Sequence, residues 1–346
     1  MVLMSYQPIY IAGNSTGLVQ NRQQQILPPD AYPVLLNAYL FREQVKRKLG
    51  CQKVARLRRV FTGLSLGNSG ASPWTFTIWS TLVPPIVPET NAEIQATSVI
   101  ITVGTDVFTD QGNGTLRRQD GNLSSTINYI SGVVTLVLLV GAGTPATIDF
   151  NYFPGLPVMG LRDRETVTSS TPSLMAFDTK YAYRYTTGGF QEFLPGTTWT
   201  GNDRNFFWST NYWTSAANLK LFWVTNFSGS AGDPIRYTDG VSWTNFAPQI
   251  DASANLLTQC LALVPYRGRL VAFNTYEGAN LATSSNFPQR IRWSAIGNPI
   301  PSGLNPDVWR DDITGKGGFI NIPTSQNITA IGFVRDNLVI YCEGST

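Results

Sequence analysis

Apolar and polar residues alternate, or form short apolar runs, along most of the chain. Residues 146–153 (ATIDFNYF) alternate as a half-buried strand does, and residues 100–103 (IITV) form an apolar run. Residues 125–141 (STINYISGVVTLVLLVG) read as two strands joined by a tight turn at Ile130-Ser-Gly. The pattern predicts an all-β protein built from many short strands.

A weak internal repeat occupies the C-terminal half, where strands rich in Trp, Tyr and Phe follow each other closely. Residues 263–278 (LVPYRGRLVAFNTYEG) align with residues 331–346 (IGFVRDNLVIYCEGST) at an offset of 68. Residues 233–240 match residues 289–297 through a shared Ile-Arg-aromatic step. The unit is strand, tight turn, strand, loop, Ile-Arg-aromatic strand and fourth strand. A four-stranded antiparallel unit repeated at roughly 50–70 residues is typical of a β-propeller blade.

Two complete blades are predicted, over residues 206–248 and 260–323, and the second contains an insertion at residues 298–316. Residues 174–196 supply part of an earlier blade, and residues 327–346 supply the first two strands of a further one. A propeller needs about four blades or more to protect its strand edges. We therefore expect the chain to be a fragment of a longer protein, or to be completed by a partner chain.

Three regions follow from these patterns. We predict an N-terminal docking arm over residues 1–59, a small β-sandwich or barrel-like domain over residues 60–160, and β-propeller blades over residues 161–346, incomplete at the C-terminus. The arm is also predicted to hold one short helix that ends at Gly50. The apolar positions of that helix are Leu35, Tyr39, Val45 and Leu49.

Charge is distributed unevenly between the arm and the rest of the chain. Residues 1–59 hold nine Lys and Arg against two acidic residues, a balance of +7, so the remainder carries −4 of the total of +3. This asymmetry favours an arm that docks on an acidic partner, and a solvated helix face is the alternative. The predicted docking residues are Arg42, Lys46, Arg47, Lys48, Arg56, Arg58 and Arg59.

The composition argues against catalysis. The chain has no histidine, which excludes Ser-His-Asp and Cys-His nucleophiles and His-ligated zinc. Cys51, Cys260 and Cys342 are odd in number and far apart, so we expect buried free thiols. The loop Asp110-Gln-Gly-Asn-Gly has too few carboxylates for calcium and reads as a turn. We predict no enzyme activity, no cofactor and no metal.

Carbohydrate chemistry is the alternative that remains open. Residues 237–243 (YTDGVSW) weakly resemble the Asp-box turn of sialidase-type propellers, which is structural in those families. The Trp side chains are expected to pack between blades, with sugar stacking as the alternative. Acidic residues are expected to form turns and caps rather than a glycosidase pair. The carboxylates considered are Glu192, Asp203, Asp233 and Asp307.

The arm resembles the N-terminal segment of nozzle, or tail-tube hub, proteins of short-tailed bacteriophages. The matching steps are Pro29-Asp-Ala-Tyr, Asn37-Ala-Tyr and the basic run from Arg42 to Gly50. Residues 108–161 are similar to the β domain that follows the arm in that family, and residues 317–346 to its propeller segment. The resemblance covers nearly the whole chain through diffuse patterns.

The resemblance implies a structural virion protein, assembled in the host cytoplasm. Such subunits form a ring, expected here to be sixfold, below the portal and adaptor, and they carry docking sites for fibres and other tail proteins. DNA is expected to pass through the lumen without specific binding. No membrane span is expected, since the most apolar run, residues 133–140, is short. A receptor- or glycan-binding tail protein is the alternative, followed by a carbohydrate-active propeller enzyme.

Overall fold

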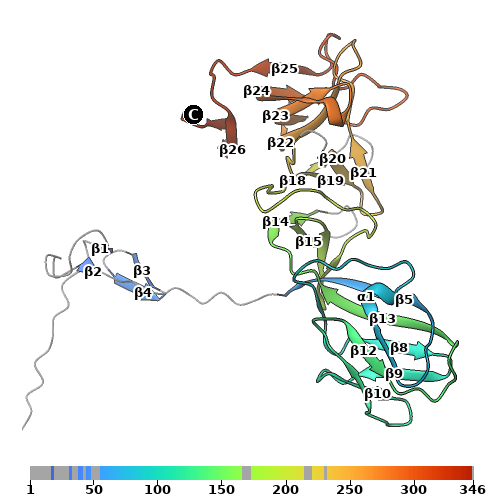
Figure 1. Ribbon diagram of the computed structural model, residues 1–346. Coiled ribbons are helices and arrows are strands. Elements are labelled where there is room, and N and C mark those ends of the chain that lie inside the picture. The colour runs from blue at the N-terminus through green and yellow to red at the C-terminus, as the bar shows by residue number, and fades with distance from the viewer. Residues whose placement is uncertain are drawn as a thin grey trace, which may run out of the picture. The chain divides into compact units, whose positions relative to one another are not determined.

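The protein is nearly all β. The computed structural model describes residues 55–165, 173–213, 220–229 and 232–344, together with the backbone of four short strands before residue 55. Apart from the single helical turn α1 (Ile78–Thr81) and the 3-10 turn η2 (Leu281–Thr283), the regular elements of this part are strands (Figure 1). The prediction of an all-β fold is confirmed. The chain divides into two compact units, Met1–Val54 and Ala55–Thr346, each described here by itself.

The first unit contains strands where a helix is predicted. Strand β1 (Gly17–Leu18) pairs in parallel with β2 (Ala31–Tyr32). Strand β3 (Ala38–Phe41) pairs antiparallel with β4 (Gln44–Arg47). The predicted short helix is therefore wrong over these two strands, and its other residues lie outside the described ones. The six-residue step from Tyr39 to Val45 breaks helical periodicity, and aromatic and β-branched residues favour strands.

The second unit begins with a small domain whose sheet curves around one core. Along β13 (Pro145–Phe153) buried and more exposed residues alternate, as the sequence pattern predicts. Buried residues from β5 and β6, near opposite ends of this strand series, belong to the same apolar cluster as those of β13. The other strands are β5 (Leu57–Asn68), β6 (Trp74–Thr77), β7 (Glu93–Ile94), β8 (Ile100–Val103), β9 (Asp106–Asp110), β10 (Thr115–Arg118), β11 (Ser125–Ile127) and β12 (Val133–Leu136).

A four-stranded antiparallel unit follows directly. Its strands are β14 (Val158–Arg164), β15 (Ser173–Asp178), β16 (Ala182–Thr186) and β17 (Gly189–Glu192), paired in that order. Only part of a blade is predicted for this region, because the segment of β14 is rich in charged residues. Strand β17 pairs in parallel with β5 through Phe190 and Leu57, so this unit is continuous with the small domain.

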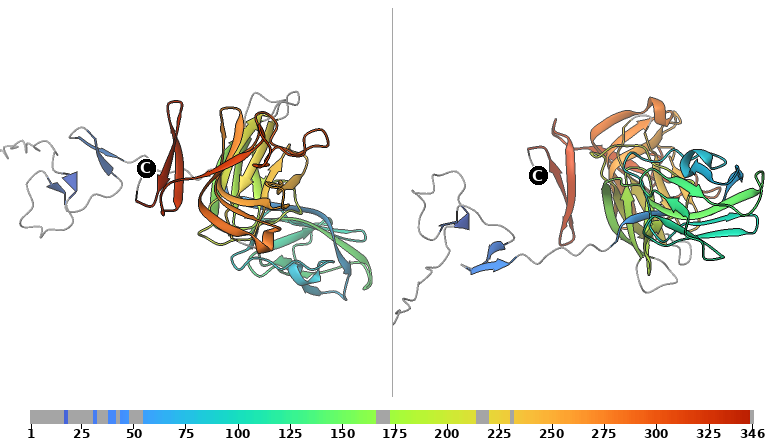
Figure 2. Two further views of the ribbon diagram at one scale, coloured as in Figure 1. Left: turned by 90° about the horizontal axis from the view of Figure 1, so that it is seen from above. Right: turned by 60° about the horizontal axis from the view of Figure 1, so that its bottom comes forward.

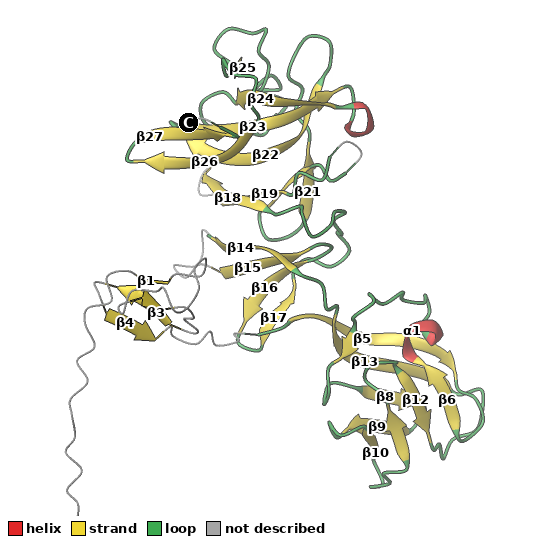
Figure 3. Ribbon diagram, turned by 60° about the vertical axis from the view of Figure 1, so that its left-hand side comes forward, coloured by secondary structure: helices red, strands yellow, loops and turns green. Residues whose placement is uncertain are grey.

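Two further four-stranded sheets and one hairpin complete the described residues (Figure 3). They match the two predicted complete blades and the two strands predicted after them. The structure does not show the sheets closed into a propeller, so that arrangement stays a prediction. The strands are β18 (Trp208–Trp213), β19 (Lys220–Thr225), β20 (Ile235–Thr238), β21 (Trp243–Phe246), β22 (Leu256–Tyr266), β23 (Arg269–Gly278), β24 (Ser285–Trp293), β25 (Gly318–Asn321), β26 (Ile328–Val334) and β27 (Asn337–Cys342).

Aromatic side chains fill the spaces between successive sheets. Trp223 of β19 is fully buried in a cluster that also contains Cys260 and Leu263 of β22. Trp199 packs against Phe177 of β15, with ring centroids 5.9 Å apart. The packing role predicted for the Trp side chains is therefore confirmed for Trp199 and Trp223. The hairpin β26–β27, drawn in red in Figure 2, packs against the β22–β25 sheet through a further cluster.

Candidate functional site

The structure describes only part of the predicted docking surface. Arg42 and Lys48 lie outside the described residues, and the side chains of Lys46 and Arg47 in β4 do too. Arg56, Arg58 and Arg59 lie at the start of the second unit, around the first residues of β5.

Arg59 is bound inside the chain. Its Nε donates to Glu192 Oε2 at 2.7 Å, and its Nη1 donates to the hydroxyls of Tyr152 at 2.9 Å and Tyr181 at 3.1 Å. Burial lowers the pKa of Arg59, but the hydrogen bond and charge of Glu192 outweigh burial and hold that pKa above its ordinary value. Arg59 therefore joins β5 to Glu192 of β17, to Tyr152 of β13 and to Tyr181, which lies just before β16.

Glu89 extends this network, and we call the whole set the Arg59 network (Arg59, Glu89, Tyr152, Lys180, Tyr181 and Glu192). Glu89 accepts from Tyr181 Oη at 2.7 Å, Lys180 Nζ at 2.9 Å and Tyr152 Oη at 3.3 Å. Burial raises the pKa of Glu89, but the donors Lys180 and Tyr181 lower it below its ordinary value. Side chains from the small domain and from the β14–β17 unit thus share one set of hydrogen bonds.

The other two arginines differ from Arg59. Arg56 Nη1 lies 2.6 Å from Glu93 Oε2, with both side chains more than a third exposed, at 35% and 44%. Its guanidinium also lies 3.9 Å from the ring centre of Phe153. Arg58 has a buried Nε without a hydrogen-bond partner among the described residues. Arg56 therefore keeps more contact with solvent than Arg59, whose side chain is 14% exposed.

The carboxylates considered for glycosidase chemistry have local structural partners. Glu192 binds Arg59, as described above. Asp233 Oδ2 accepts from the backbone N–H of Thr200 and from Asn226 Nδ2, each at 2.6 Å. Asp307 lies 3.4 Å from Arg310. Asp203 is exposed in a turn. The turn and cap roles predicted for these residues fit Asp203, Asp233 and Asp307, whereas Glu192 lies in strand β17 and forms an ion pair instead.

The Asp-box-like turn also has a structural role. Arg164 Nη2 of β14 donates to the carbonyl oxygen of Asp239 at 2.8 Å. Gly240 has φ +110°, and a Cβ there would collide with the Arg164 guanidinium. The turn between β20 and β21 therefore needs glycine both for its backbone conformation and for the close approach of Arg164.

The arginines of the repeated Ile-Arg-aromatic step are buried at the centres of ion-pair networks. Arg292 of β24 is 2% exposed, and its Nε and Nη2 each donate to Glu277 at 2.9 Å. Its Nη1 donates to Asp311 at 3.0 Å, and Arg290 Nη1 donates to Glu277 at 2.8 Å. Burial raises the pKa of Glu277, but Arg292 outweighs burial and lowers that pKa below its ordinary value.

Arg236 occupies the matching position in β20. Its Nη1 donates to the carbonyl of Thr198 at 2.8 Å, its Nε donates to Asn245 at 3.1 Å, and its guanidinium lies 4.8 Å from the ring centre of Trp199. From the sequence, this arginine is visible only as a position that aligns the two repeats. Its recurrence in a strand of apolar residues is the signal for a buried, paired charge.

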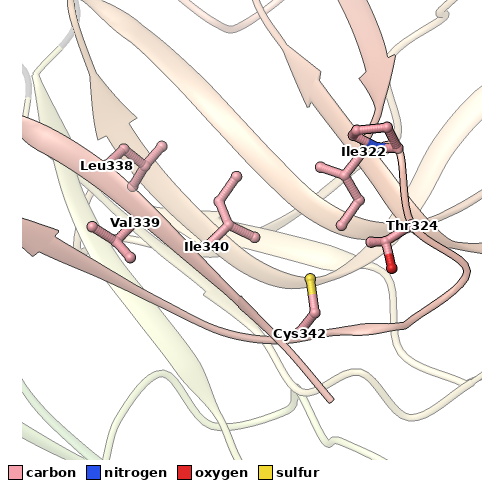
Figure 4. Close-up of a pocket in the computed structure, with 7 residues that line it drawn as sticks. Ile322, Thr324, Leu338, Val339, Ile340 and Cys342 are labelled. Carbon is pink, nitrogen blue, oxygen red and sulfur yellow. The ribbon is translucent and has the colours of Figure 1, made fainter. Parts of the chain in front are cut away.

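Apolar surface is exposed at the hairpin at the end of the sheet series. A cavity of about 590 Å³ lies beside β27. Figure 4 shows Ile322 and Thr324 on one side of it and Leu338, Ile340 and Cys342 of the hairpin on the other. Phe333, Val334 and Tyr341 of the same hairpin are 40% to 56% exposed. This apolar edge is the candidate interaction site of the described residues.

Other predicted features have simple structural roles. Asp110 Oδ1 accepts from the N–H of Gly112 and from Tyr129 Oη, so the Asp110 loop is held as a turn.

The cysteines of the described residues are free thiols. Cys260 is buried, as predicted, and burial raises its pKa. Cys342 is half-buried, and Cys51 lies outside the described residues. Within the described ranges, no group of three or more Cys, Asp or Glu is placed to hold a metal ion.

No family model matches the chain, and no curated protein matches its sequence. Among the helices that the structure describes, none has the length and apolar character needed to cross a membrane.

Proposed function

We propose that this protein is a structural subunit of the tail of a short-tailed bacteriophage, in the nozzle ring through which DNA leaves. The observation that carries the proposal is the use of buried charge. The Arg59 network joins the small domain to the β14–β17 unit, and the Arg292–Glu277 pair joins β24 to β23 within one sheet. Charges used in this way hold neighbouring strands together inside the chain, which suits a subunit that transmits force and carries other proteins.

The distribution of net charge supports the same role. The arm, with a balance of +7, suits docking on an acidic neighbour, and residues 60–346, with −4, suit a channel along which DNA slides. The partners in this proposal are further copies of the chain in a sixfold ring, the portal and adaptor, and fibre or other tail proteins. The site of action is the virion, after assembly in the host cytoplasm.

A glycan-binding tail protein is the second candidate, and one observation favours it. A polar cleft of about 510 Å³ is lined by Thr197, Thr198, Arg236, Trp243 and Asn245, among others. Hydroxyl, amide and guanidinium groups around an aromatic ring are the usual components of a sugar-binding site. Saturable binding on a glycan array, lost when Thr198 and Asn245 are replaced by Val and Leu, would favour this candidate.

Ring assembly tests the first proposal. The purified protein should form rings in negative-stain images and a mass of several copies by light scattering. The Lys46→Glu, Arg47→Glu, Lys48→Glu triple variant should lose at least about tenfold in association constant, since like charges at an interface oppose assembly by more than about 1.4 kcal/mol.

A matched triple variant controls for net charge. Arg117→Glu, Arg162→Glu, Arg204→Glu changes the net charge equally at exposed positions outside the arm. It should assemble as the wild type does. Equal loss in both variants would show a general charge effect, and a protein that stays monomeric at all concentrations would contradict the ring.

A further inference from the structure

Arginines gather on one face of the sheet that contains β5 and the four strands β14–β17, which lie side by side in Figure 3. Residues directly opposite each other on neighbouring strands point to the same face of a sheet. Arg184 of β16 lies opposite Gln191 of β17, and Gln191 lies opposite Arg58 of β5. On its other side, Arg184 lies opposite Met175 of β15. Arg58 and Arg184 therefore share a face with Met175.

Arg164 belongs to the same face. It lies opposite Ser173, and Ser173 is two residues before Met175 in β15, so alternation along the strand places both side chains of β15 on one face. We call Arg58, Arg164, Ser173 and Arg184 the arginine face. Its residues lie toward the end of the sheet where β14 ends, β15 begins and β16 turns into β17.

Arg164 is a buried arginine without an acidic partner. Four arginines of the described residues are at most 9% exposed. The three that form ion pairs are Arg118, Arg236 and Arg292. Arg164 is 5% exposed and forms no ion pair within the described residues. Burial and the charge of Arg184 lower the pKa of Arg164, and the charge of Asp239 opposes them only in part. A buried charge without a counter-ion is costly, so an added anion would stabilise this site.

Hydrogen-bond donors at the arginine face are also unused. Nη2 of Arg164 donates to the carbonyl oxygen of Asp239, but Nε of Arg164 is buried and has no partner among the described residues. The same holds for the hydroxyl of Ser173. Arg184 is exposed, and its guanidinium and that of Arg164 each lie 5.4 Å from the ring centre of Phe193. Guanidinium and hydroxyl groups that lack acceptors are the groups that bind an oxyanion.

A carboxylate on a flexible side chain fits these donors better than the phosphates of duplex DNA. The donors of Arg164 and Ser173 are recessed, and DNA phosphates are fixed in their backbone. The arginines lie on β14, β16 and β5, which are every second strand of the sheet order. Two strand spacings are about 10 Å, and an extended chain advances by about the same distance every three residues. Acidic residues at every third position would therefore meet the arginines in turn.

We propose that the arginine face binds an extended acidic segment of another protein, with one carboxylate at Arg164 and Ser173 and further carboxylates at Arg184 and Arg58. Arg58 is one of the docking residues predicted from the sequence, and the other three are not. The inference goes beyond the virion role and does not depend on it, because it rests on one sheet of the fold alone.

A fluorescein-labelled peptide of three Asp-Gly-Ser repeats is the probe, and a peptide of Asn-Gly-Ser repeats is its neutral control. Titrated with the intact protein at low ionic strength, the acidic peptide should give saturable fluorescence polarisation. The neutral peptide should bind at least about tenfold more weakly, because it lacks the ionised acceptors that strengthen hydrogen bonds to arginine.

A charge reversal tests the arginine face itself. The Arg184→Glu variant should bind the acidic peptide at least about tenfold more weakly, because a like charge then opposes binding. Arg117→Glu makes the same change of charge at an exposed position of β10, in the small domain, and is the matched control. It should bind the acidic peptide as the wild type does.

Ser173→Ala separates binding from folding. Because the Ser173 hydroxyl has no partner within the described residues, alanine should leave the midpoint of urea denaturation unchanged. The affinity for the acidic peptide should nevertheless fall at least about threefold, through loss of one hydrogen bond to the bound carboxylate. An affinity that this substitution leaves unchanged would overturn the assignment of a carboxylate to this position.

The remaining outcomes concern the occupant. The proposal is overturned by the absence of saturable binding, by equal binding of the neutral peptide, or by equal effects of the Arg184 and Arg117 substitutions. A labelled DNA duplex that binds more tightly than the peptide, and that Arg184→Glu releases, would make DNA the occupant. Self-association in sedimentation that Arg184→Glu weakens would make a second copy of this chain the occupant. Either result would also overturn the proposal.

Discussion

Arg56 and Arg59 are three positions apart in a basic run, yet their surroundings differ greatly. Arg59 is 14% exposed and its partner Glu192 is 7% exposed, whereas Arg56 and Glu93 face solvent. A buried charge that loses its counter-ion keeps its desolvation cost, while an exposed charge is rehydrated. The same residue type therefore has different energetic importance at the two positions.

Substitution of Arg59 and of Arg56 should show this difference in their contributions to stability. Arg59→Met leaves Glu192 buried without its ion pair, and we expect it to lower the free energy of unfolding by about 3–5 kcal/mol. Arg56→Met should lower it by at most about 1 kcal/mol. Urea denaturation followed by tryptophan fluorescence measures both. Similar small effects at both positions would contradict a stabilising Arg59 network.

Asp178 gives the folding stability a defined pH dependence. Burial raises its pKa to about 6, against hydrogen bonds from Tyr183 and from the backbone of Lys180 and Tyr181, compared with an ordinary value of 3.8. Because the folded carboxyl holds its proton more tightly, this group favours folding most below about pH 4. Its contribution then falls by about 3 kcal/mol in total as the pH rises from about 3 through 6 to about 7.

The Asp178→Asn variant lacks this titration and should be stabilised relative to the wild type by about 2 kcal/mol on going from pH 4 to pH 6. Glu89, whose pKa is lowered, contributes the opposite slope, but it is present in both proteins and cancels in their difference. Urea denaturation at a series of pH values measures that difference. A difference that does not change with pH would contradict the raised pKa.

At the scale of elements, turns and strand partners decide how one sheet meets the next. The β20–β21 turn is held from outside its own sheet, by Arg164 of β14. Gly240→Ala should therefore lower the free energy of unfolding by roughly 1–3 kcal/mol, through backbone strain at positive φ and displacement of Arg164.

Gly303→Ala is the matched control for that substitution, since nothing lies within 4 Å of a Cβ at Gly303. It should change stability by less than about 0.5 kcal/mol. Both variants are compared by urea denaturation. If the two glycines tolerate alanine equally, then the turn does not depend on Arg164.

For the whole molecule, the order of the strands could be predicted from sequence, and their long-range partners could not. The two complete four-stranded sheets and the final hairpin follow from alternation, turn residues and the repeat. The parallel pairing of β17 with β5 joins residues 190 and 57, and no local pattern reports such a contact. The charged strand β14 was missed for the same reason, because its place depends on pairing with β15.

For the candidate sites too, the sequence shows which charged residues are present, and only the fold shows which partners they bind. The arginine of the repeated step is visible in sequence, but its burial against Glu277 appears only once β23 and β24 pair. The basic run before residue 60 is visible too, but the fold binds Arg59 internally.

The sequence alone determined the all-β class, the repeated four-stranded unit and the absence of histidine chemistry, because period-two alternation, turn residues and composition are local properties of the chain. The tertiary structure decided which charges are buried and paired, that β3 and β4 are strands rather than helix, and which arginines share one face of the β14–β17 sheet. These depend on which distant segments meet, and the free energy of each charge depends on that meeting.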